Sequence, residues 1–233
     1  MNRRVFLKLS GEALSGQSSS YDEKVVADVA RQVKISVDAG VQIGIIIGGG
    51  NYWRGRTSND MDRTKADQMG MLATVMNCIY VSEAFRHAGM KTIIYSPFIC
   101  GNMTELFAKD KVNESFEKGM VVFFAGGTGH PYFSTDSGIA LRAIEMDADM
   151  ILLAKSIDGV YSADPQKDAN AIRYDRISID EVIEKNLQVV DMTASVLCRE
   201  HGMPLAVFDM RGEDAIANAL MGNVVGTIVT VES

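Results

Sequence analysis

The sequence predicts an α/β fold, namely a single-domain, three-layer αβα sandwich around a mainly parallel sheet. Short apolar runs alternate with stretches of helical period along the chain, and the runs are apolar throughout instead of at every second position. Such runs are typical of parallel strands that helices cover on both faces. The chain has 21 glycines but only 4 prolines, which suits tight turns between strands and helices. Its 233 residues suffice for one hydrophobic core without disulfides or a structural metal.

Seven apolar runs are the expected strands. They cover residues 5–9, 41–47, 91–95, 120–124, 150–153, 205–208 and 227–231. Between the first two runs, valines recur at helical spacing from Val26 to Val37, and Gly40 ends this helix. Further helices are expected at about 64–88, 135–146, 179–185, 193–201 and 214–221. At most, the segment after Asp158 begins a second lobe.

One side of the expected 64–88 helix is apolar. It carries Met69, Leu72, Met76 and Ile79 at helical spacing. Methionines in such a pattern indicate core filling or a subunit contact more often than a cofactor site. Tyr52 and Trp53 precede this helix, and the sequence leaves open whether they are surface loop residues or anchor an interface.

The charge balance and the cysteines exclude several classes of protein. The chain has 30 acidic and 23 basic residues and a net charge of -7, so a surface for nucleic acid or anionic lipid is not expected. A local basic pocket for a small phosphorylated ligand is still compatible with this balance. The three cysteines form no CxxC pair, which gives no sign of a zinc site or disulfide framework. Because no signal peptide or membrane span is evident either, we expect a cytoplasmic protein.

Three of the turns that follow expected strands are rich in glycine. They are Ser10-Gly11, Gly48-Gly49-Gly50 and Gly126-Gly127-Thr128-Gly129. Ligands of open α/β sheets bind beyond the carboxyl ends of the strands, where glycine lets backbone amides approach phosphate oxygens closely. One such turn is weak evidence, but three at one sheet edge predict a phosphate site. The common phosphate motifs GxxxxGK[ST] and GxGxxG and the protein-kinase signatures are absent.

Charged residues beside these turns are candidates for the chemistry. Lys8 interrupts an apolar strand, and an ammonium there is costly unless it faces an anion or reaches solvent. Arg54 follows the triple glycine and offers a forked donor for phosphate oxygens, although a solvated loop arginine explains it equally well. Asp136 falls in the first turn of a helix that Ser134 or Thr135 would cap, where an acid is favourable in any case.

Five motifs follow one another along the chain. They are Lys-Leu-Ser-Gly-Glu at 8–12, Gly-Gly-Gly-Asn-x-x-Arg at 48–54, Asp-x-Met-Gly-Met-Leu-Ala-Thr at 67–74, Gly-Thr-Gly-x-Pro-x-Phe-x-Thr-Asp at 127–136 and Asp-Gly-Val-Tyr-x-x-Asp-Pro at 158–165. Together they resemble the bacterial uridylate kinases, which belong to the amino acid kinase superfamily. The resemblance covers nearly the whole chain and implies a single amino acid kinase-like domain over 1–233. In it, about 1–150 form the UMP side and about 151–233 the ATP side.

The resemblance implies transfer of the γ-phosphoryl group of ATP to UMP, giving UDP and ADP for pyrimidine nucleotide biosynthesis. It implies that Lys8 bridges to the transferred phosphoryl group, that Arg54 assists, and that Asp136 holds the catalytic lysine in place. The remaining implied ATP contacts, besides Lys8 and Arg54, are Leu9, Ser10, Gly11, Gly50, Lys155, Tyr161 and Asp164. The implied UMP contacts are Gly49, Asp67, Thr128, Gly129, His130, Pro131, Tyr132, Phe133, Ser134 and Thr135. No protein ligand of a metal is implied, because Mg2+ arrives with ATP.

The same resemblance implies a homohexamer and feedback inhibition by UTP. Activation by GTP is doubtful, because Ser82 and Ile93 stand where we would expect two arginines in members that GTP activates. A further departure is His130, where asparagine is expected in many relatives; both side chains can donate a hydrogen bond.

Two other functions remain open from the residues alone. A sibling enzyme of the same superfamily could phosphorylate a carboxylate or a carbamate, but it would have no nucleotide for Asp67 and the loop at 128–135 to hold. A non-enzymatic sensor of pyrimidine nucleotides would bind without turnover, which Lys8 and Asp136 argue against. An added DNA-binding role has no support from the net charge of -7.

Overall fold

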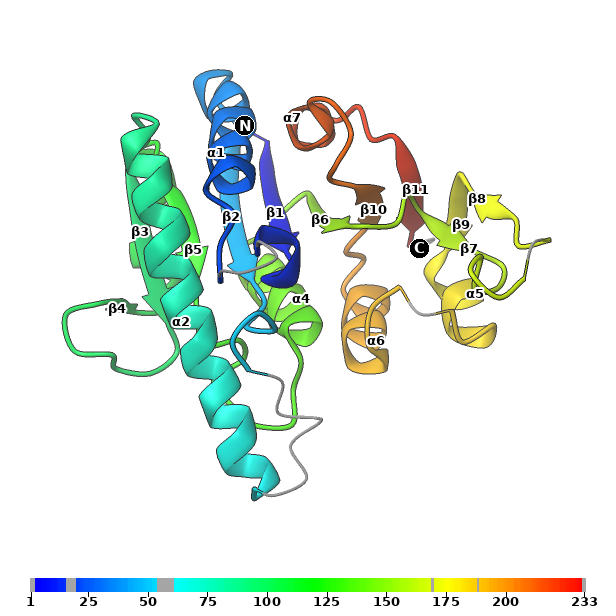
Figure 1. Ribbon diagram of the computed structural model, residues 1–233, viewed down its shortest axis with the longest axis horizontal. Helices are drawn as coiled ribbons and strands as arrows, with labels where there is room; N and C mark the ends of the chain where they lie inside the picture. The colour runs from blue at the N-terminus through cyan, green and yellow to red at the C-terminus, as the bar shows by residue number, and fades with distance from the viewer. Residues whose placement is uncertain (1–2, 16–19, 54–60, 169, 188, 232–233) are drawn as a thin grey trace.

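A mainly parallel sheet runs through the whole molecule (Figure 1). The computed structural model describes residues 3–15, 20–53, 61–168, 170–187 and 189–231. The strands of the main sheet are β1 Arg4–Leu9, β2 Gln42–Ile47, β3 Thr92–Ser96, β4 Glu105–Leu106, β5 Val121–Phe124, β6 Met150–Lys155, β9 Arg176–Ser178, β10 Leu205–Asp209 and β11 Gly226–Thr230. Within the described residues their order is β4-β3-β5-β2-β1-β6-β10-β11-β9, and only the β10–β11 pair is antiparallel.

The seven expected strands are therefore confirmed, and four short ones are additions. Two of the additions, β7 Val160–Tyr161 and β8 Arg173–Tyr174, pair with each other as an antiparallel ribbon beside the main sheet. The other two, β4 and β9, have two and three residues. Segments this short contain no measurable period, which is why the hydrophobic pattern did not indicate them.

The helices are α1 Glu23–Asp38, α2 Arg63–His87, α3 Lys109–Glu117, α4 Thr135–Glu145, α5 Ile179–Glu184, α6 Met192–Glu200, α7 Ala215–Leu220 and the 3-10 helix η1 Glu12–Leu14. The six expected helices are confirmed within a few residues at each end. The sequence analysis missed α3, a largely charged helix whose buried apolar residues are Val112 and Phe116. None of the helices in the described ranges is long and apolar enough to span a membrane.

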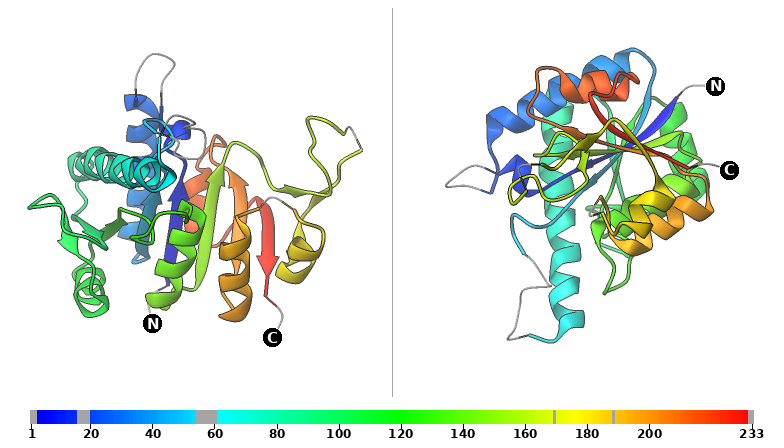
Figure 2. Two further views of the ribbon diagram at one scale, coloured as in Figure 1. Left: turned by 90° about the horizontal axis from the view of Figure 1, so that it is seen from below. Right: turned by 90° about the vertical axis from the view of Figure 1, so that its right-hand side faces the viewer.

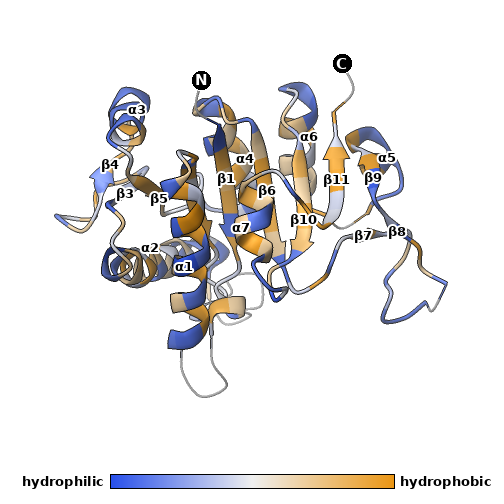
Figure 3. Cartoon of the chain, turned by 90° about the horizontal axis from the view of Figure 1, so that it is seen from above, coloured by the Kyte–Doolittle hydropathy of each residue, from blue (hydrophilic) through white to orange (hydrophobic). Residues whose placement is uncertain are grey.

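Two layers of helices cover the sheet, which confirms the three-layer sandwich (Figure 2). Along β1, Val5, Leu7 and Leu9 pack into one hydrophobic cluster with α1, α2 and α7, whereas Phe6 packs into a second cluster with α3 to α6. Successive strand residues point to opposite faces, so a continuous apolar run serves both clusters. The central strands are accordingly coloured as hydrophobic along most of their length in Figure 3.

The register brings the carboxyl ends of the central strands to one edge. Leu9 at the end of β1 pairs with Ile47 at the end of β2 and with Ala154 near the end of β6. The backbone N–H of Gly48 then donates to the carbonyl oxygen of Leu9 at 3.0 Å. The glycine turns after β1 and β2 therefore begin side by side, at the edge where open α/β sheets bind ligands.

Asp191 joins the start of α6 to the start of α4. As the cap of α6, its carboxylate accepts a hydrogen bond from the backbone N–H of Ala194 at 2.9 Å. It also accepts from the hydroxyl of Ser137 at 2.9 and 3.0 Å and from the hydroxyl of Ser134, which caps α4. Burial alone would raise the pKa of Asp191, but the bonds from Ser134, Ala194 and Ser137 outweigh it and hold the pKa below its usual 3.8.

We predict that Asp191→Asn lowers the free energy of unfolding near neutral pH. Because the folded state holds the pKa of Asp191 below the unfolded value of 3.8, the charge contributes fully above that value and is lost as pH falls through the folded pKa. Urea unfolding at a series of pH values should show a difference between parent and variant that shrinks below about pH 5. Asp180→Asn, at an exposed acid of α5, is the control; a difference that stays constant down to about pH 4 would contradict the prediction.

Candidate active site

Lys8 and Asp136 form an ion pair at the centre of the sheet edge. Lys8 is the penultimate residue of β1, and its Nζ lies 2.6 Å from Oδ1 of Asp136 in the first turn of α4. Their side chains are only 17% and 18% exposed, so each charge depends on the other for compensation. The structure thus brings together two of the three residues that the resemblance implied as catalytic. The third, Arg54, lies outside the described residues.

Lys155 adds a second cation beside this pair. It ends β6, the neighbour of β1, and its ammonium donates to the carbonyl oxygen of Val189. Burial lowers the pKa of Lys155 below its usual range; the nearby Asp136 opposes this shift and the charge of Lys8 adds to it. Two lysines and one aspartate from β1, β6 and α4 therefore share one small volume, which suits a polyanionic ligand.

A cavity of about 280 Å³, here called the N-terminal cavity, is lined by described residues from the turn after β2, from α2 and from the segment after β5. Its floor is formed by Gly49 and Gly50 after β2 and by Gly126 and Gly127 after β5. Glycine is required at Gly49, because an added Cβ would lie 2.8 Å from the carbonyl oxygen of Gly70 and 2.9 Å from Cβ of Ala73. The volume approaches that of ordinary small-molecule pockets.

Two side chains of α2 hold the glycine turns of this cavity in place. The hydroxyl of Thr74 accepts a hydrogen bond from the backbone N–H of Gly126 at 2.8 Å and donates to the carbonyl oxygen of Met71 at 2.6 Å. The amide of Asn77 donates to the carbonyl oxygen of Gly48 at 2.7 Å. Both side chains are buried, at 4% and 0% exposure. One helix thus fixes the turn after β5 and the turn after β2.

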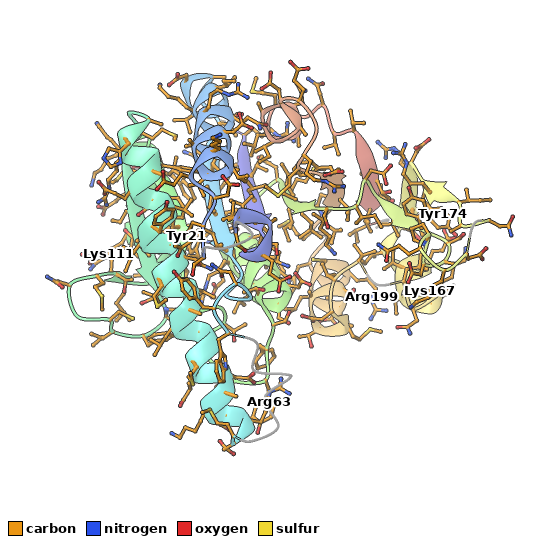
Figure 4. All side chains as sticks on the ribbon, viewed as in Figure 1. Tyr21, Arg63, Lys111, Lys167, Tyr174 and Arg199 are labelled. Atoms are coloured by element: carbon orange, nitrogen blue, oxygen red, sulfur yellow. The ribbon has the colours of Figure 1, made fainter. Side chains whose placement is uncertain are left out.

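Asp67 connects α2 to the loop that covers the N-terminal cavity. Its carboxylate accepts from Nε of Arg63 at 2.9 Å and from the backbone N–H of Tyr132 at 2.8 Å. Tyr132 has a φ of 71°, which is unusual for a residue with a side chain, and the ring lies 5.5 Å from the Arg63 guanidinium. These contacts attach the loop to the N-terminal end of α2, where Figure 4 labels Arg63.

Residues from β6 onward line a larger cavity of about 500 Å³, here called the C-terminal cavity. Lys155, Tyr161 and Asp164 lie on its wall, together with Lys167 and Lys185. The hydroxyl of Tyr161 donates to Asp158 at 2.8 Å, which lowers the pKa of Asp158 and raises that of Tyr161. The volume falls within the usual range of cofactor and substrate sites.

A middle cavity of about 430 Å³ shares walls with both of the others. Lys155 lines the C-terminal and the middle cavity, and Ser134 lines the N-terminal and the middle cavity. Asp136 lies on the wall of the middle cavity. The carboxylate of the ion pair therefore lies on the cavity that shares wall residues with both of the others.

The structure separates the residues implied for the loop at 128–135 into two groups. Thr128, His130, Phe133, Ser134 and Thr135 line the N-terminal cavity. Gly129, Pro131 and Tyr132 lie outside its described lining, and Tyr132 is 63% exposed. Tyr132 acts instead through its backbone N–H on Asp67, which does line the cavity.

The structure shows which atoms of the turn after β1 are open to a ligand. The side chain of Leu9 is wholly buried in the core, so any contact with a ligand there comes from its backbone. A Cβ on Gly11 would lie 2.3 Å from the carbonyl oxygen of Gly48, so Gly11 serves close packing of the two turns. Ser10 between them is half-buried. Gly50, expected on the ATP side, lines the N-terminal cavity beside Gly49.

Several site residues were missed from the sequence. Trp53, Gly70 and Thr74 line the N-terminal cavity, and Asn186 and Asp191 line the middle one. Gly70 and Thr74 fall within the quoted motif at 67–74, which was a usable signal. Asp191 precedes a helix, and this position indicates a cap but not its bonds to α4.

Comparisons with known proteins bear on the fold and the family. A family model described as the amino acid kinase family matches residues 3–209. The UMP kinase from Ureaplasma parvum is 36% identical over 99% of each chain, with a TM-score of 0.93. The UMP kinase from Bacillus anthracis is 31% identical over 99% of this chain and 97% of that one, with a TM-score of 0.94. The uridylate kinase from Archaeoglobus fulgidus, 24% identical over 97% and 99% of the two chains, shares the fold at a TM-score of 0.74.

The family model covers nearly the whole sheet together with Lys8, Asp136, Lys155 and all three cavities. The two bacterial structures extend the likeness over almost the full chain at more than 30% identity. This chain belongs to the amino acid kinase family.

Proposed function

We propose that this protein is a UMP kinase, which transfers the γ-phosphoryl group of ATP to UMP and releases UDP and ADP. The observation that carries the proposal is the Lys8–Asp136 ion pair, whose carboxylate lines a middle cavity that shares Lys155 with the C-terminal cavity and Ser134 with the N-terminal cavity. The likeness to two UMP kinases over almost the whole chain supports the choice of acceptor.

The two cavities divide the two nucleotides between them. ATP occupies the C-terminal cavity, against Lys155, Tyr161 and Asp164, with its phosphates directed toward Lys8. UMP occupies the N-terminal cavity, with its phosphate at Gly49 and its ribose at Asp67. The loop at 128–135 covers UMP, and its attachment to Asp67 supports this role. In this proposal, the part of the chain up to about residue 150 binds the acceptor and the rest binds the donor.

In the transfer, an oxygen of the UMP phosphate attacks the γ-phosphorus, and the bond from that phosphorus to the bridging oxygen of ADP breaks. The nucleophile is already an anion, so the reaction depends on alignment and on neutralising charge. Lys8 neutralises charge on the moving group, and Asp136 keeps its ammonium aimed between the two ligands. The N-terminus of α4, capped by Ser134, adds the positive end of its dipole at the same point.

A divalent cation fits this site as part of the ATP complex. Within the described ranges, no group of three His, Cys, Asp or Glu side chains could hold a metal ion on its own. The phosphate oxygens of ATP would therefore supply most ligands. Asp136 and Asp191 are the carboxylates on the wall of the middle cavity, and both already bind protein groups, Lys8 in the first case and Ser134, Ser137 and Ala194 in the second. Mg2+ bound in this way would neutralise negative charge on the phosphates.

Lys8→Ala should lower kcat by about a hundredfold to a thousandfold, because it removes charge stabilisation in the transition state. UMP affinity should change by less than about threefold, since the N-terminal cavity lies to one side of Lys8. Trp53, the only tryptophan in the sequence, lines that cavity and reports UMP binding by its fluorescence. Lys24→Ala, at an exposed lysine of α1, is the matched control. A variant that keeps a substantial share of parental kcat would remove Lys8 from this role.

A coupled assay of ADP release with UMP, CMP, dTMP, AMP and GMP tests the substrate. We expect turnover with UMP alone, because the resemblance is to UMP kinases throughout. The same reactions run with aspartate, glutamate or carbamate and hydroxylamine test the sibling activity, since an acyl phosphate gives a hydroxamate and a nucleoside diphosphate does not. Turnover with none of the nucleotides would contradict the proposed function.

The proposed homohexamer finds support in the outer face of α2. Met69, Leu72, Met76 and Ile79 are exposed there, at 39% to 52%, and recur at intervals of three and four residues. An apolar stripe of this kind is typical of a helix that packs against another helix. Figure 1 shows the N-terminal half of α2 extending beyond the rest of the molecule.

The double variant Leu72→Glu, Met76→Glu should therefore sediment as a smaller species than the parent, because it places charge in this contact. Ile35→Glu, at an exposed residue of α1, is the control for added charge alone. If the double variant sediments with the parent, α2 does not form the contact. Cytoplasmic location, inhibition by UTP and the doubtful activation by GTP stay predictions from the sequence.

A further inference from the structure

The side-chain amide of Asn77 is a buried polar group whose bonds all leave its own helix. Its Nδ2 donates to the carbonyl oxygen of Gly48 at 2.7 Å and to Oδ1 of Asn51 at 2.8 Å. Its Oδ1 accepts from the hydroxyl of Tyr21 at 2.8 Å and from Nδ2 of Asn51 at 3.1 Å. An amide has two donor hydrogens and two acceptor lone pairs, so its capacity is fully used. Because the Gly48 carbonyl only accepts, the orientation of the amide is also fixed.

Asn77 lies beneath the junction of two glycine turns. A Cβ placed on Gly11 would lie 2.3 Å from the Gly48 carbonyl oxygen, 2.5 Å from Oδ1 of Asn51 and 2.9 Å from Nδ2 of Asn77. The turn after β1, which follows Lys8, therefore rests on the same atoms that fix the turn after β2. Through Gly48 and Asn51, the amide sets the spacing between Lys8 and the glycines of the N-terminal cavity.

Tyr21 anchors the network from outside. Its ring stacks on Tyr80 of α2, with centroids 3.7 Å apart and planes inclined by 4°, and its hydroxyl reaches Asn77. Figure 4 shows Tyr21 against the middle of α2, well away from Arg63 at the end of that helix. Asn51 extends the network further, because its Nδ2 also donates to the carbonyl oxygen of Ser20 at 3.1 Å. The segment before α1, α2 and both turns are thus joined at one side chain.

We infer that Asn77 is a positioning residue for phosphoryl transfer, which holds the two glycine turns at the spacing that aligns donor and acceptor. The inference rests on the proposed kinase function. Three polar residues of α2 are buried, namely Thr74, Asn77 and Ser82. The hydroxyl of Ser82 donates to the carbonyl oxygen of Ile79 in its own helix, whereas every bond of Asn77 goes to another segment, and burying an amide is costly unless all its bonds are made. The bonds of Asn77 go to the turn that contributes Gly49 and Gly50 to the N-terminal cavity.

The substitution Asn77→Asp tests this role with almost no change of shape. When ionised, the introduced carboxylate keeps the acceptors for Tyr21 and Asn51 but lacks both donors, and it faces the Gly48 carbonyl with negative charge. Once protonated, the introduced carboxyl group regains one O–H that can donate to Gly48. Burial raises the pKa of a carboxyl group, which brings this protonation into an accessible range. The loss of kcat in the variant should therefore depend on pH, which a general loss of stability would not cause.

The titratable groups near Asn77 do not obscure the pH dependence of kcat that is expected of the variant. Among the described residues, Tyr52, Tyr80 and Cys78 interact with the hydroxyl of Tyr21 that is bonded to Asn77, and Glu12 lies beside Gly50. Burial raises the pKa of the Tyr21 hydroxyl above its usual range and that of the Cys78 thiol to about 12, so neither changes charge near neutral pH. The parent enzyme, measured in parallel, accounts for the pH dependence of the substrates and of every group that it shares with the variant.

We expect kcat of Asn77→Asp to fall by about tenfold to a hundredfold near pH 8, with KM for both nucleotides changed much less, because alignment is lost while binding contacts remain. The ratio of variant to parental kcat should then recover severalfold as pH falls to about 6. Asn113→Asp, the same substitution at an asparagine of α3 that accepts from Arg4 at 3.0 Å, should keep parental kcat. Trp53 fluorescence follows UMP binding independently of turnover.

The inference would be overturned if the ratio of variant to parental kcat stayed near one at every pH. It would also be overturned if kcat of Asn77→Asp fell and did not recover at low pH. If Asn77→Asp does not fold, Asn51→Ala is the second variant, because it removes the two hydrogen bonds between Asn51 and Asn77. This variant should lower kcat by about threefold to tenfold without recovery at low pH. If the folded Asn51→Ala variant kept parental kcat, the inference about Asn77 would likewise be overturned. Failure of the proposed function is distinguishable, because the parent would then show no turnover with any nucleotide.

Discussion

A charge in the middle of a hydrophobic sheet determines how the rest of the site is built. Lys8 lies in β1, between β2 and β6, and both of its neighbours in the strand are buried in the core. An ammonium at this place needs an anion, which α4 supplies as Asp136 at 2.6 Å. The placement of α4 depends in turn on Ser134 and Ser137, whose hydroxyls Asp191 holds. The position of one lysine is thus secured by contacts that reach to the start of α6.

Backbone N–H groups supply much of the favourable interaction with anions that an acidic chain cannot supply with charged side chains. The net charge is -7, yet the proposed ligands are two polyanions. The turns after β1, β2 and β5 bring backbone N–H groups to one edge, and glycine allows the close packing that this requires. Lys8 and Lys155 add positive charge at the centre of this edge, and Lys167 and Lys185 add it on the wall of the C-terminal cavity.

The sequence predicted the fold well because long strands and helices have hydrophobic patterns long enough to detect. Seven continuous apolar runs and six helical periods marked the main elements, whereas the two-residue strands and the largely charged α3 left no pattern to detect. At the site, the strand ends predicted that the glycine turns lie together, since parallel strands end at one edge. The pairing of Lys8 with Asp136 was implied only by the family resemblance, and the structure shows it at 2.6 Å. The roles of Thr74, Asn77 and Asp191 could not be predicted, because each bonds to a segment distant in sequence.

Contacts between segments distant in sequence also explain why a motif match does not reveal which atoms of Leu9 and Gly11 could face a ligand. Leu9 and Gly11 match the motif, but the side chain of Leu9 belongs to the core, and Gly11 serves the packing of two turns. A motif records which residues are required, whereas the structure shows which atoms face the ligand. Asp67 is an example, since the sequence indicates an acid at this position and only the fold shows that the acid also holds the backbone of Tyr132.

In the proposed assembly α2 is used on both of its faces, and this limits how the protein can change over evolution. Its inner face holds the turns of the N-terminal cavity through Thr74 and Asn77, and its outer face presents the stripe from Met69 to Ile79. A helix in one piece cannot adjust one face by rotation or sliding without displacing the other. Changes in the outer stripe are therefore tolerated only when they leave the axis and register of α2 unchanged, so the stripe should diverge by exchange of similar side chains while the inner polar residues stay fixed.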